Sequence, residues 1–389
     1  MTSSNFTRLS CIEEITPGVT PGAGNFMGMR WTGESLTGTP QTAQSEEART
    51  DRASGGQVQT GLEVGGDWNF EVSTNATFKA WLRSVMKQSA YAAEVVTAAA
   101  SLSVTAATGV IAGAGVDFTV FSVGDLVRLE GFGANNGKVV YVTAAASGSL
   151  TVAGKLVDEA GGAGRTVRRC EYVEVGADDV TFTIEKAFTK LADKSIVYRG
   201  ARGDTLSLGF AYGEIATATI GIAATGYETP AALVTQGRTI TDPGSTRALN
   251  ASSDVGLVIQ DGAKVGFPIQ SLSLELQNNH EPDVNLGNVG PEDYTPGEAS
   301  IGVTLSAYLK DANWDFMAKK LSQAPVQIAY YAQNEFGGLA VQIPEAQFTF
   351  PDPQAGGKNQ KVTLELQGTA KAPTAGGSPL RIYWLPALA

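Results

Sequence analysis

The chain has 389 residues, enough for two or three domains that each have a core of their own. Its formal net charge of −11 argues against a surface that grips nucleic acid, because such a surface needs clustered lysine and arginine. Charged residues make up only 17% of the sequence while it holds 46 glycines, which favours a β-rich globular protein with many tight turns. No apolar run is long enough to cross a bilayer, and no signal-peptide pattern opens the chain, so we expect assembly in a cytoplasm.

The first segment, residues 1–24, contains Pro17, Gly18 and Pro21 and shows little periodicity. It predicts an N-terminal arm whose order depends on a neighbour. After a first strand near residues 25–31 comes a long polar loop with a mixed run of charges: Glu46, Glu47, Arg49, Asp51 and Arg52. Such a run is usually a solvated loop, and the alternative is a loop that makes polar contacts with another subunit.

The clearest local pattern is a strand that leads directly into a helix. From Leu62 to Val72 apolar residues alternate with polar ones, which predicts a strand with one buried face. Three carboxylates fall on the polar parity: Glu63, Asp67 and Glu71. Apolar residues at helical spacing then predict an amphipathic helix behind the candidate N-caps Ser73, Thr74 and Asn75: Phe78, Trp81, Leu82, Val85 and Met86. We expect this helix to lie on the sheet that contains its own strand.

Residues 94–170 have a separate, turn-rich β pattern, with a strong hairpin signal at Asn136 and Gly137. We interpret them as a small β-domain inserted at a loop tip. The insertion divides a first unit into residues 25–93 and 171–226. Its Arg165, Arg168 and Arg169 indicate an exposed edge strand rather than a nucleic-acid site.

The strand-to-helix pattern returns in a second unit, residues 266–372, after a Gly- and Pro-rich connector over residues 227–265. Residues 299–307 alternate as a strand, and Trp314, Met317, Ala318 and Leu321 then take up helical spacing. The order of the predicted elements agrees in both units, which indicates a duplication; the alternative is that two α+β units look alike by chance. Residues 373–389 form a C-terminal arm with an apolar end.

The sequence offers no credible active site. His280 is the only histidine, and we expect it to be a solvated turn residue. Cys11 and Cys170 lie too far apart in the chain to suggest a disulfide framework or a zinc site. The glycine-rich stretches lack the spacing of a phosphate loop. We therefore expect no enzymatic activity, no metal and no cofactor.

At this stage a family resemblance can be stated. The run RWTGESLTGTPQTAQSEEARTDR (residues 30–52), then GGDWNFEVS (65–73) with a short helix, and later TFTIEKAF (181–188), resembles major tail tube proteins of long-tailed, siphovirus-like bacteriophages. The insert is similar to small β-domains that such proteins carry outside the tube. The resemblance implies a mainly β fold: a duplicated tail-tube β-sandwich or barrel with one flanking helix per half, plus the inserted small β-domain.

The resemblance also implies a structural virion protein. It would be assembled in the host cytoplasm and would polymerise into stacked rings that form the tail tube for DNA ejection. The DNA would pass through without specific binding, and the partners would be other copies of the chain, a tape measure protein, and tail terminator and distal tail proteins. A channel for DNA should be acidic, so the candidate lumen residues are Glu63, Asp67, Glu71, Glu275, Glu298 and Glu365. They could instead face solvent or pair with basic side chains of neighbouring subunits.

Two further alternatives follow from these expectations. If an ancestral ring had six single-domain copies, a duplicated chain would close it with three, so we expect homotrimeric, pseudo-hexameric rings; without duplication a homohexamer is expected. The loops Thr32–Gln59, which holds the charged residues 46–52, and Asn278–Thr295 would reach the adjacent ring. The competing function is a phage capsid decoration or baseplate structural protein.

Overall fold

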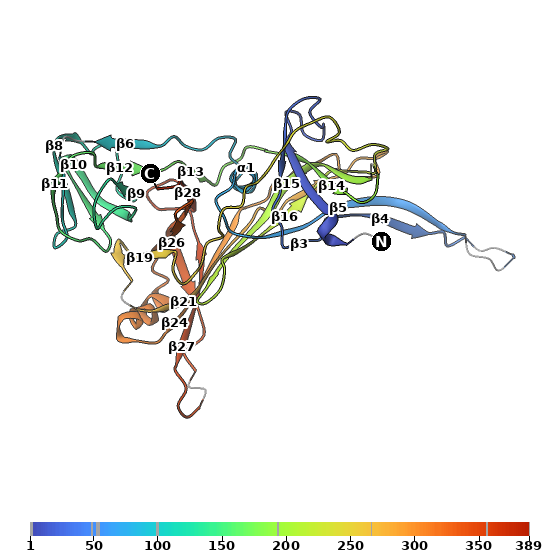
Figure 1. The fold of residues 1–389 in the computed structure, drawn as a ribbon. Helices are drawn as coiled ribbons and strands as arrows, with labels where there is room; N and C mark the ends of the chain where they lie inside the picture. The colour runs from blue at the N-terminus through green and yellow to red at the C-terminus, as the bar shows by residue number, and fades with distance from the viewer. Residues whose placement is uncertain are drawn as a thin grey trace.

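The computed structural model describes residues 3–47, 50–51, 55–98, 101–192, 194–265, 267–354 and 357–388. Within these ranges the chain is mainly β with two α-helices, which confirms the predicted fold class. Figure 1 shows a body of long, twisted strands, a separate group of strands at one end and a long hairpin that projects from the other end.

In the first half the elements are η1 (Ser4–Phe6), β1 (Thr7–Glu13), β2 (Phe26–Gly28), β3 (Gly33–Glu34), β4 (Thr37–Gln44), β5 (Gln57–Glu71), α1 (Ala76–Met86), β13 (Tyr172–Glu174), β14 (Phe182–Phe188), β15 (Ser195–Ala211), β16 (Thr217–Ala223), β17 (Gly226–Glu228) and β18 (Ile240–Thr241). The insert holds β6 (Val95–Ala98), β7 (Leu102–Thr105), β8 (Val110–Asp117), β9 (Leu126–Glu130), β10 (Val139–Ala153), β11 (Glu159–Gly162) and β12 (Thr166–Arg169). The second half holds β19 (Val255–Gln260), β20 (Ala263–Lys264), β21 (Ile269–Gln277), β22 (Glu281–Asp283), β23 (Asp293–Thr295), β24 (Ser300–Tyr308), η2 (Asp311–Asn313), α2 (Asp315–Ser322), β25 (Val326–Asn334), β26 (Gly337–Thr349), β27 (Thr363–Ala370) and β28 (Arg381–Leu385).

The two halves repeat the same strand pairings. In the first half β5 pairs with β16, β16 with β15, β15 with β14 and β14 with β1, all antiparallel. In the second half β24 pairs with β27, β27 with β26, β26 with β25 and β25 with β19, again all antiparallel. Helix α1 follows β5 as α2 follows β24, and β17 pairs with β15 as β28 pairs with β26. This shared order supports the duplication that the sequence pattern predicts.

Helix α1 lies on the apolar face of its own strand. Asn75 is the N-cap, and its side-chain oxygen accepts a hydrogen bond from the backbone N–H of Phe78 at 2.8 Å. Phe78 packs edge-on against Phe70, and Trp81 packs against Trp68, with ring centroids 4.9 and 6.0 Å apart. The expected position of this helix is therefore confirmed.

Replacing Asn75 with alanine is expected to lower the free energy of unfolding by about 1 kcal/mol, because the amide of Phe78 loses its acceptor. Denaturant-induced unfolding measures this loss. Thr74→Ala is the matched control: the Thr74 hydroxyl donates to the Phe336 carbonyl at the surface, not to the helix, so its loss should be smaller. Equal losses in the two variants would contradict the capping role.

Helix α2 buries Phe316, which is not among the apolar residues predicted for its buried face. Phe316 is fully buried, edge-on to Phe267 and Phe348, while Trp314 and Leu321 are 60% and 86% exposed. The predicted apolar face is therefore wrong for Trp314, Ala318 and Leu321, whereas Met317 does pack against the core. The error has a physical reason: α2 has only eight residues, and spacing alone cannot decide which apolar side of so short a helix meets the sheet.

The halves are joined within one sheet. Residues Thr205–Ala211 of β15 pair with Gln277–Ser271 of β21, so the strands β5, β16, β15, β21, β24 and β27 follow one another without a break. A second link is made where β13 of the first half pairs with β28 of the second. The junction between the halves is therefore a continuous part of the fold rather than a flexible hinge.

The three segments expected as arms or connector all contribute strands. Within residues 1–24, β1 pairs with β14 and buries Leu9 and Cys11. Within residues 227–265, β18 pairs with β2 and β19 with β25. Within residues 373–389, β28 pairs with both β26 and β13. Their apolar runs are too short to show a period, so only their partners in the fold define them as strands.

The inserted strands β6–β12 pair only with one another and have a separate apolar core. The insert nevertheless rests firmly on the second half, at the left of Figure 1. Leu126 and Val139 pack with Tyr331 and Tyr383 in a small apolar cluster. The insert therefore covers the outer face of β25 and β26, whose other face contributes to the main core.

Candidate functional site

The most extensive candidate site is one face of the sheet that both halves share. Along β5, β16, β15, β21, β24 and β27 alternate residues are buried: Val64, Trp68, Phe70, Leu206, Leu208, Ala218, Ile220, Leu272, Leu274, Leu276, Ile301, Val303, Leu305, Leu364 and Leu366. The residues between them point to the opposite face, because side chains alternate along a strand. We call this opposite side the polar face. Its neutral members are mainly Ser, Thr, Gly, Asn and Gln.

The six strands give the polar face carboxylates and no cations, although Lys361, in the loop before β27, reaches its edge with its Nζ 4.5 Å from the ring centroid of Tyr308. Five of the six candidate lumen residues lie on it: Glu63, Asp67 and Glu71 on β5, Glu275 on β21 and Glu365 on β27. The sequences of these six strands, with β15 taken from residue 205 to its end, contain no lysine or arginine. In the described part of the chain, none of the candidate lumen residues takes part in an ion pair. Most residues that the six strands place on this face are therefore neutral, and their charged residues are all carboxylates.

The sixth candidate, Glu298, lies just before β24, in the loop rather than on the strand. It is exposed, and its backbone carbonyl accepts a hydrogen bond from the Asn279 side chain at 2.9 Å. It therefore lies at the margin of the polar face.

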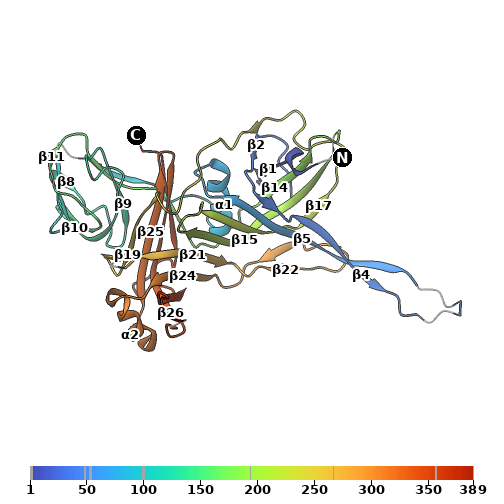
Figure 2. The same cartoon turned by 60° about the horizontal axis from the view of Figure 1, so that its bottom comes forward.

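Two hairpins leave the same end of this sheet. The longer, β4–β5, extends away from the body in Figure 2, and Glu46, Glu47 and Asp51 are exposed near its tip. Arg49 and Arg52, the other charged residues expected there, lie outside the described residues. The shorter hairpin, β22–β23, follows β21. Both hairpins occupy equivalent places in the duplicated pattern.

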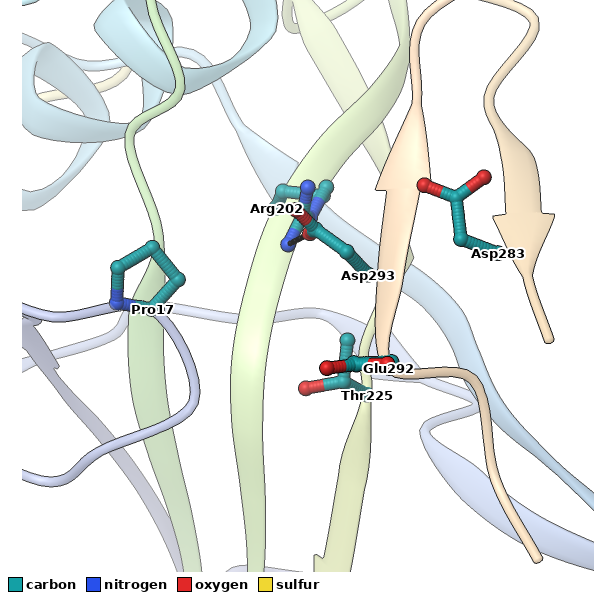
Figure 3. Close-up of a pocket in the computed structure, with 6 residues that line it drawn as sticks. All are labelled: Pro17, Arg202, Thr225, Asp283, Glu292 and Asp293. Atoms are coloured by element: carbon teal, nitrogen blue, oxygen red, sulfur yellow. Dashed lines mark hydrogen bonds and ion pairs between the residues drawn. The ribbon is translucent and has the colours of Figure 1, made fainter. Parts of the chain in front are cut away.

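A buried charged cluster holds the shorter hairpin against the first half. The guanidinium of Arg202, only 1% exposed, contacts Asp179 at 3.0 Å and Asp293 at 2.6 Å, and also donates to the Tyr294 carbonyl. Lys87 contacts the same Asp179 at 3.2 Å. Figure 3 shows Arg202 and Asp293 meeting beside a pocket of about 430 Å³, lined also by Pro17, Thr225, Asp283 and Glu292. Both terminal nitrogens of Arg202 are paired with carboxylates, whereas its buried Nε has no hydrogen-bond partner among the described residues. Ion pairs between fixed elements of one chain are typical of a structural cluster.

His280 belongs to the same junction, and the expectation of a solvated turn residue is wrong. Its side chain is 1% exposed, and its Nδ1 lies 2.8 Å from Asp204 of β15. Burial opposes ionisation of Asp204, but hydrogen bonds from the His280 ring and backbone outweigh it and hold the pKa of this carboxyl below its ordinary value. The His280 ring is buried because the chain leaves β21 directly beside Asp204 of β15.

The other groups considered for chemistry are structural in this fold. Cys11 and Cys170 are buried free thiols, and burial raises the pKa of Cys11 to about 12 and that of Cys170 to about 11. Among the described residues no group of three or more His, Cys, Asp or Glu side chains is placed to hold a metal ion. Within the same ranges no helix is long and apolar enough to span a membrane.

These features define a class of protein: a duplicated β-subunit with a long acidic face and two projecting hairpins. Comparison with known families agrees. The family model described as phage tail tube protein matches residues 5–370, and the chain belongs to that family. No curated protein matches it. It is thus a structural protein of the phage tail, and its family implies self-assembly into a tube.

Proposed function

We propose that three copies of the chain close a ring whose inner wall is the polar face, and that these rings stack into the tube through which DNA is ejected. The observation that carries this proposal is the acidic face, to which its six strands contribute no lysine or arginine. Like charge keeps a polyanion from adhering to the wall. Glu63, Asp67, Glu71, Glu275 and Glu365 would line the channel, with Glu298 at its margin. Assembly would take place in the host cytoplasm, around a tape measure protein and between terminator and distal tail proteins.

The number of strands favours three chains over six. The pairings β4–β5–β16–β15–β21–β24–β27–β26 give each chain eight strands for the wall. Three chains would supply about 24 strands, and at the usual strand spacing and tilt their barrel is roughly 50 Å across between backbones. Six chains would make a wall roughly 100 Å across. The smaller channel already admits a DNA duplex.

The junction inside the chain suggests how neighbouring chains meet. Among the described residues, Thr37–Ala43 of β4 pair with no strand but β5, and residues 347–349 of β26 pair with no strand but β27, so a further strand can be added at each end of the wall. Pairing of such edges between copies would close the ring. Helix α1 is covered by the second half, where Phe78 meets Trp384 at 6.1 Å, whereas Trp314 and Leu321 of α2 are exposed. If the second half of one copy meets the first half of the next copy as the two halves meet within one chain, the first half of the next copy would cover α2.

The mass of a solubilised ring, or the symmetry of the tube in electron micrographs, tests this arrangement. Three chains per ring are expected. Six chains per ring would overturn the pseudo-sixfold arrangement. Overexpressed protein that never polymerises would instead favour a capsid decoration or baseplate role.

Reversing charge on the wall is expected to leave assembly intact but to make the tube bind DNA. The triple variant Asp67→Lys, Glu275→Lys and Glu365→Lys places cations on three strands of the polar face, where they can contact phosphates. Sedimentation of tubes with short DNA duplexes at rising salt measures the effect, and the bound fraction should fall steeply with salt.

The matched control reverses three exposed carboxylates of the insert: Glu94, Asp117 and Asp158. It has the same net charge as the wall variant but no cation on the polar face. Binding should therefore be weaker and should not depend on open tube ends. Equal binding by both variants would contradict a lumenal position of the polar face.

A further inference from the structure

We infer that rings are held together by an apolar knob and pocket: the tip of the β22–β23 hairpin of one copy seats in a pocket at the start of β21 of a copy in the next ring. The knob is Leu286 with its neighbours Val284 and Val289. This inference rests on the proposed tube and names the surfaces through which its rings stack.

The knob is apolar and unusually exposed. Val284, Leu286 and Val289 are 74%, 107% and 52% exposed, and no residue from 284 to 291 is charged. Three exposed aliphatic side chains on one short loop form a patch typical of a contact surface.

The base of this hairpin is rigid. Arg202 pairs with Asp293, His280 contacts Asp204, and the Thr295 hydroxyl donates to Asp283 at 2.9 Å. The hairpin therefore presents its tip in a fixed position, which lowers the entropy lost on docking. The buried charged cluster would therefore serve to fix the hairpin that carries the knob.

The pocket is of matching chemistry and size. It has a volume of about 80 Å³, a few times the ~30 Å³ share of one water molecule in the liquid, which suits a branched aliphatic side chain. Its apolar lining comes from Phe210, Tyr212, Val255, Val258, Ile269, Leu272 and Tyr330. Tyr212 forms an accessible rim, being 80% exposed.

One polar atom in this lining has no partner in the fold. The hydroxyl of Tyr330 is buried and makes no hydrogen bond within the described part of the chain. An unpaired buried hydroxyl costs free energy. The fold therefore accepts a local cost at a residue that lines the pocket.

The knob and the pocket cannot meet within one copy. Ile269 and Leu272, which line the pocket, lie at the start of β21, whereas the hairpin follows its end at Gln277. Contact between unlike surfaces at opposite ends is head-to-tail, and it propagates a stack without closing it.

The other hairpin does not fit this pocket. The tip of β4–β5 carries Glu46, Glu47 and Asp51, whose burial in an apolar pocket without partners would be costly. We therefore assign the apolar contact to the second-half hairpin. The charged hairpin is left for polar contacts elsewhere on the adjacent ring.

The first experiment is a cysteine cross-link in the full chain between knob and rim. The double variant Leu286→Cys and Tyr212→Cys, assembled and then mildly oxidised, should give a ladder of covalent oligomers on a non-reducing gel. A disulfide requires the two Cα atoms within about 7 Å. Each single variant is the control and should give no ladder, because the native Cys11 and Cys170 are buried. Tubes of the double variant that show no ladder would overturn the inference.

The second experiment separates stacking from ring formation. Leu286→Asp should still form rings but no tubes, as seen by negative-stain microscopy and sedimentation, whereas Val123→Asp, at an exposed apolar position on the insert, should form normal tubes. Normal tubes from Leu286→Asp would overturn the knob while leaving the tube function intact. Wild-type protein that forms neither rings nor tubes would overturn the proposed function, and this inference with it.

Discussion

Deleting residues 94–170 is expected to lower the stability of the remaining fold by about 5 kcal/mol and to make it aggregate. The insert covers Ala329, Tyr331, Ala340, Tyr383 and Leu385, which are at most 8% exposed. Each large apolar side chain that loses its cover costs roughly 1.5–3 kcal/mol, and alanines cost less. The exposed faces of β25 and β26 would also offer an apolar sheet surface to other copies.

The ends of the insert allow this deletion without strain. Ala92 and Tyr172 form a β-bridge, so a short glycine and serine linker can join the chain there. Thermal unfolding and analytical sedimentation of the shortened protein measure the effect. Unchanged stability and normal tubes would contradict the bracing role of the insert.

A repaired deletion separates bracing from assembly. The same deletion with Ala329→Thr, Tyr331→Thr and Ala340→Thr keeps good strand formers and makes the uncovered faces of β25 and β26 more polar. If the insert lies outside the tube and only braces the second half, this variant should regain solubility and form tubes. A repaired variant that is soluble and folded but never assembles would indicate that the insert makes contacts between subunits.

Local patterns in the sequence predicted much of the architecture because they depend on neighbours in the chain. The alternation through β5 places Glu63 and Asp67 opposite Val64 and Trp68, as the structure has them. The two halves could be recognised as a repeat because each repeats a strand, a helix and three further strands in order. The nearly continuous apolar run of β25 also carried a signal of burial on both faces, and this signal was missed.

The junction between the halves could not be predicted in the same way. Arg202 meets Asp293 across 91 residues, and His280 meets Asp204 across 76. Nothing near these residues in the sequence distinguishes them from exposed loop charges, so only the pairing of β15 with β21 brings them together. The buried face of the short helix α2 could not be predicted for a related reason, since it depends on contact with Phe348 of β26.

Replacing Arg202 with methionine is expected to lower the free energy of unfolding by about 2–4 kcal/mol and to loosen the β22–β23 hairpin. Methionine keeps much of the side-chain volume, but Asp293 then loses its cation, and Asp179 retains only Lys87. Breaking a buried pair by removing one partner costs about 3–5 kcal/mol, and the estimate is reduced here because Asp293 is half exposed. Arg202→Lys should cost less, since the charge remains while the forked geometry is lost.

The pH dependence of stability provides a second readout that a pure packing defect would not change. Burial opposes ionisation of Asp293, but the Tyr294 backbone N–H and Arg202 outweigh it and lower the pKa of this carboxyl. A lowered pKa in the fold means stabilisation that is complete above the ordinary aspartate value of about 4 and lost as pH falls through the folded-state value. Arg202→Met should therefore flatten the acid limb of the stability curve as well as lower it. The same ion pair fixes the hairpin that carries Leu286. Above pH 5, Arg202→Met should therefore weaken the stacking of rings more than Asn75→Ala does. Equal stacking in the two variants would show that the charged cluster is not needed to position the knob.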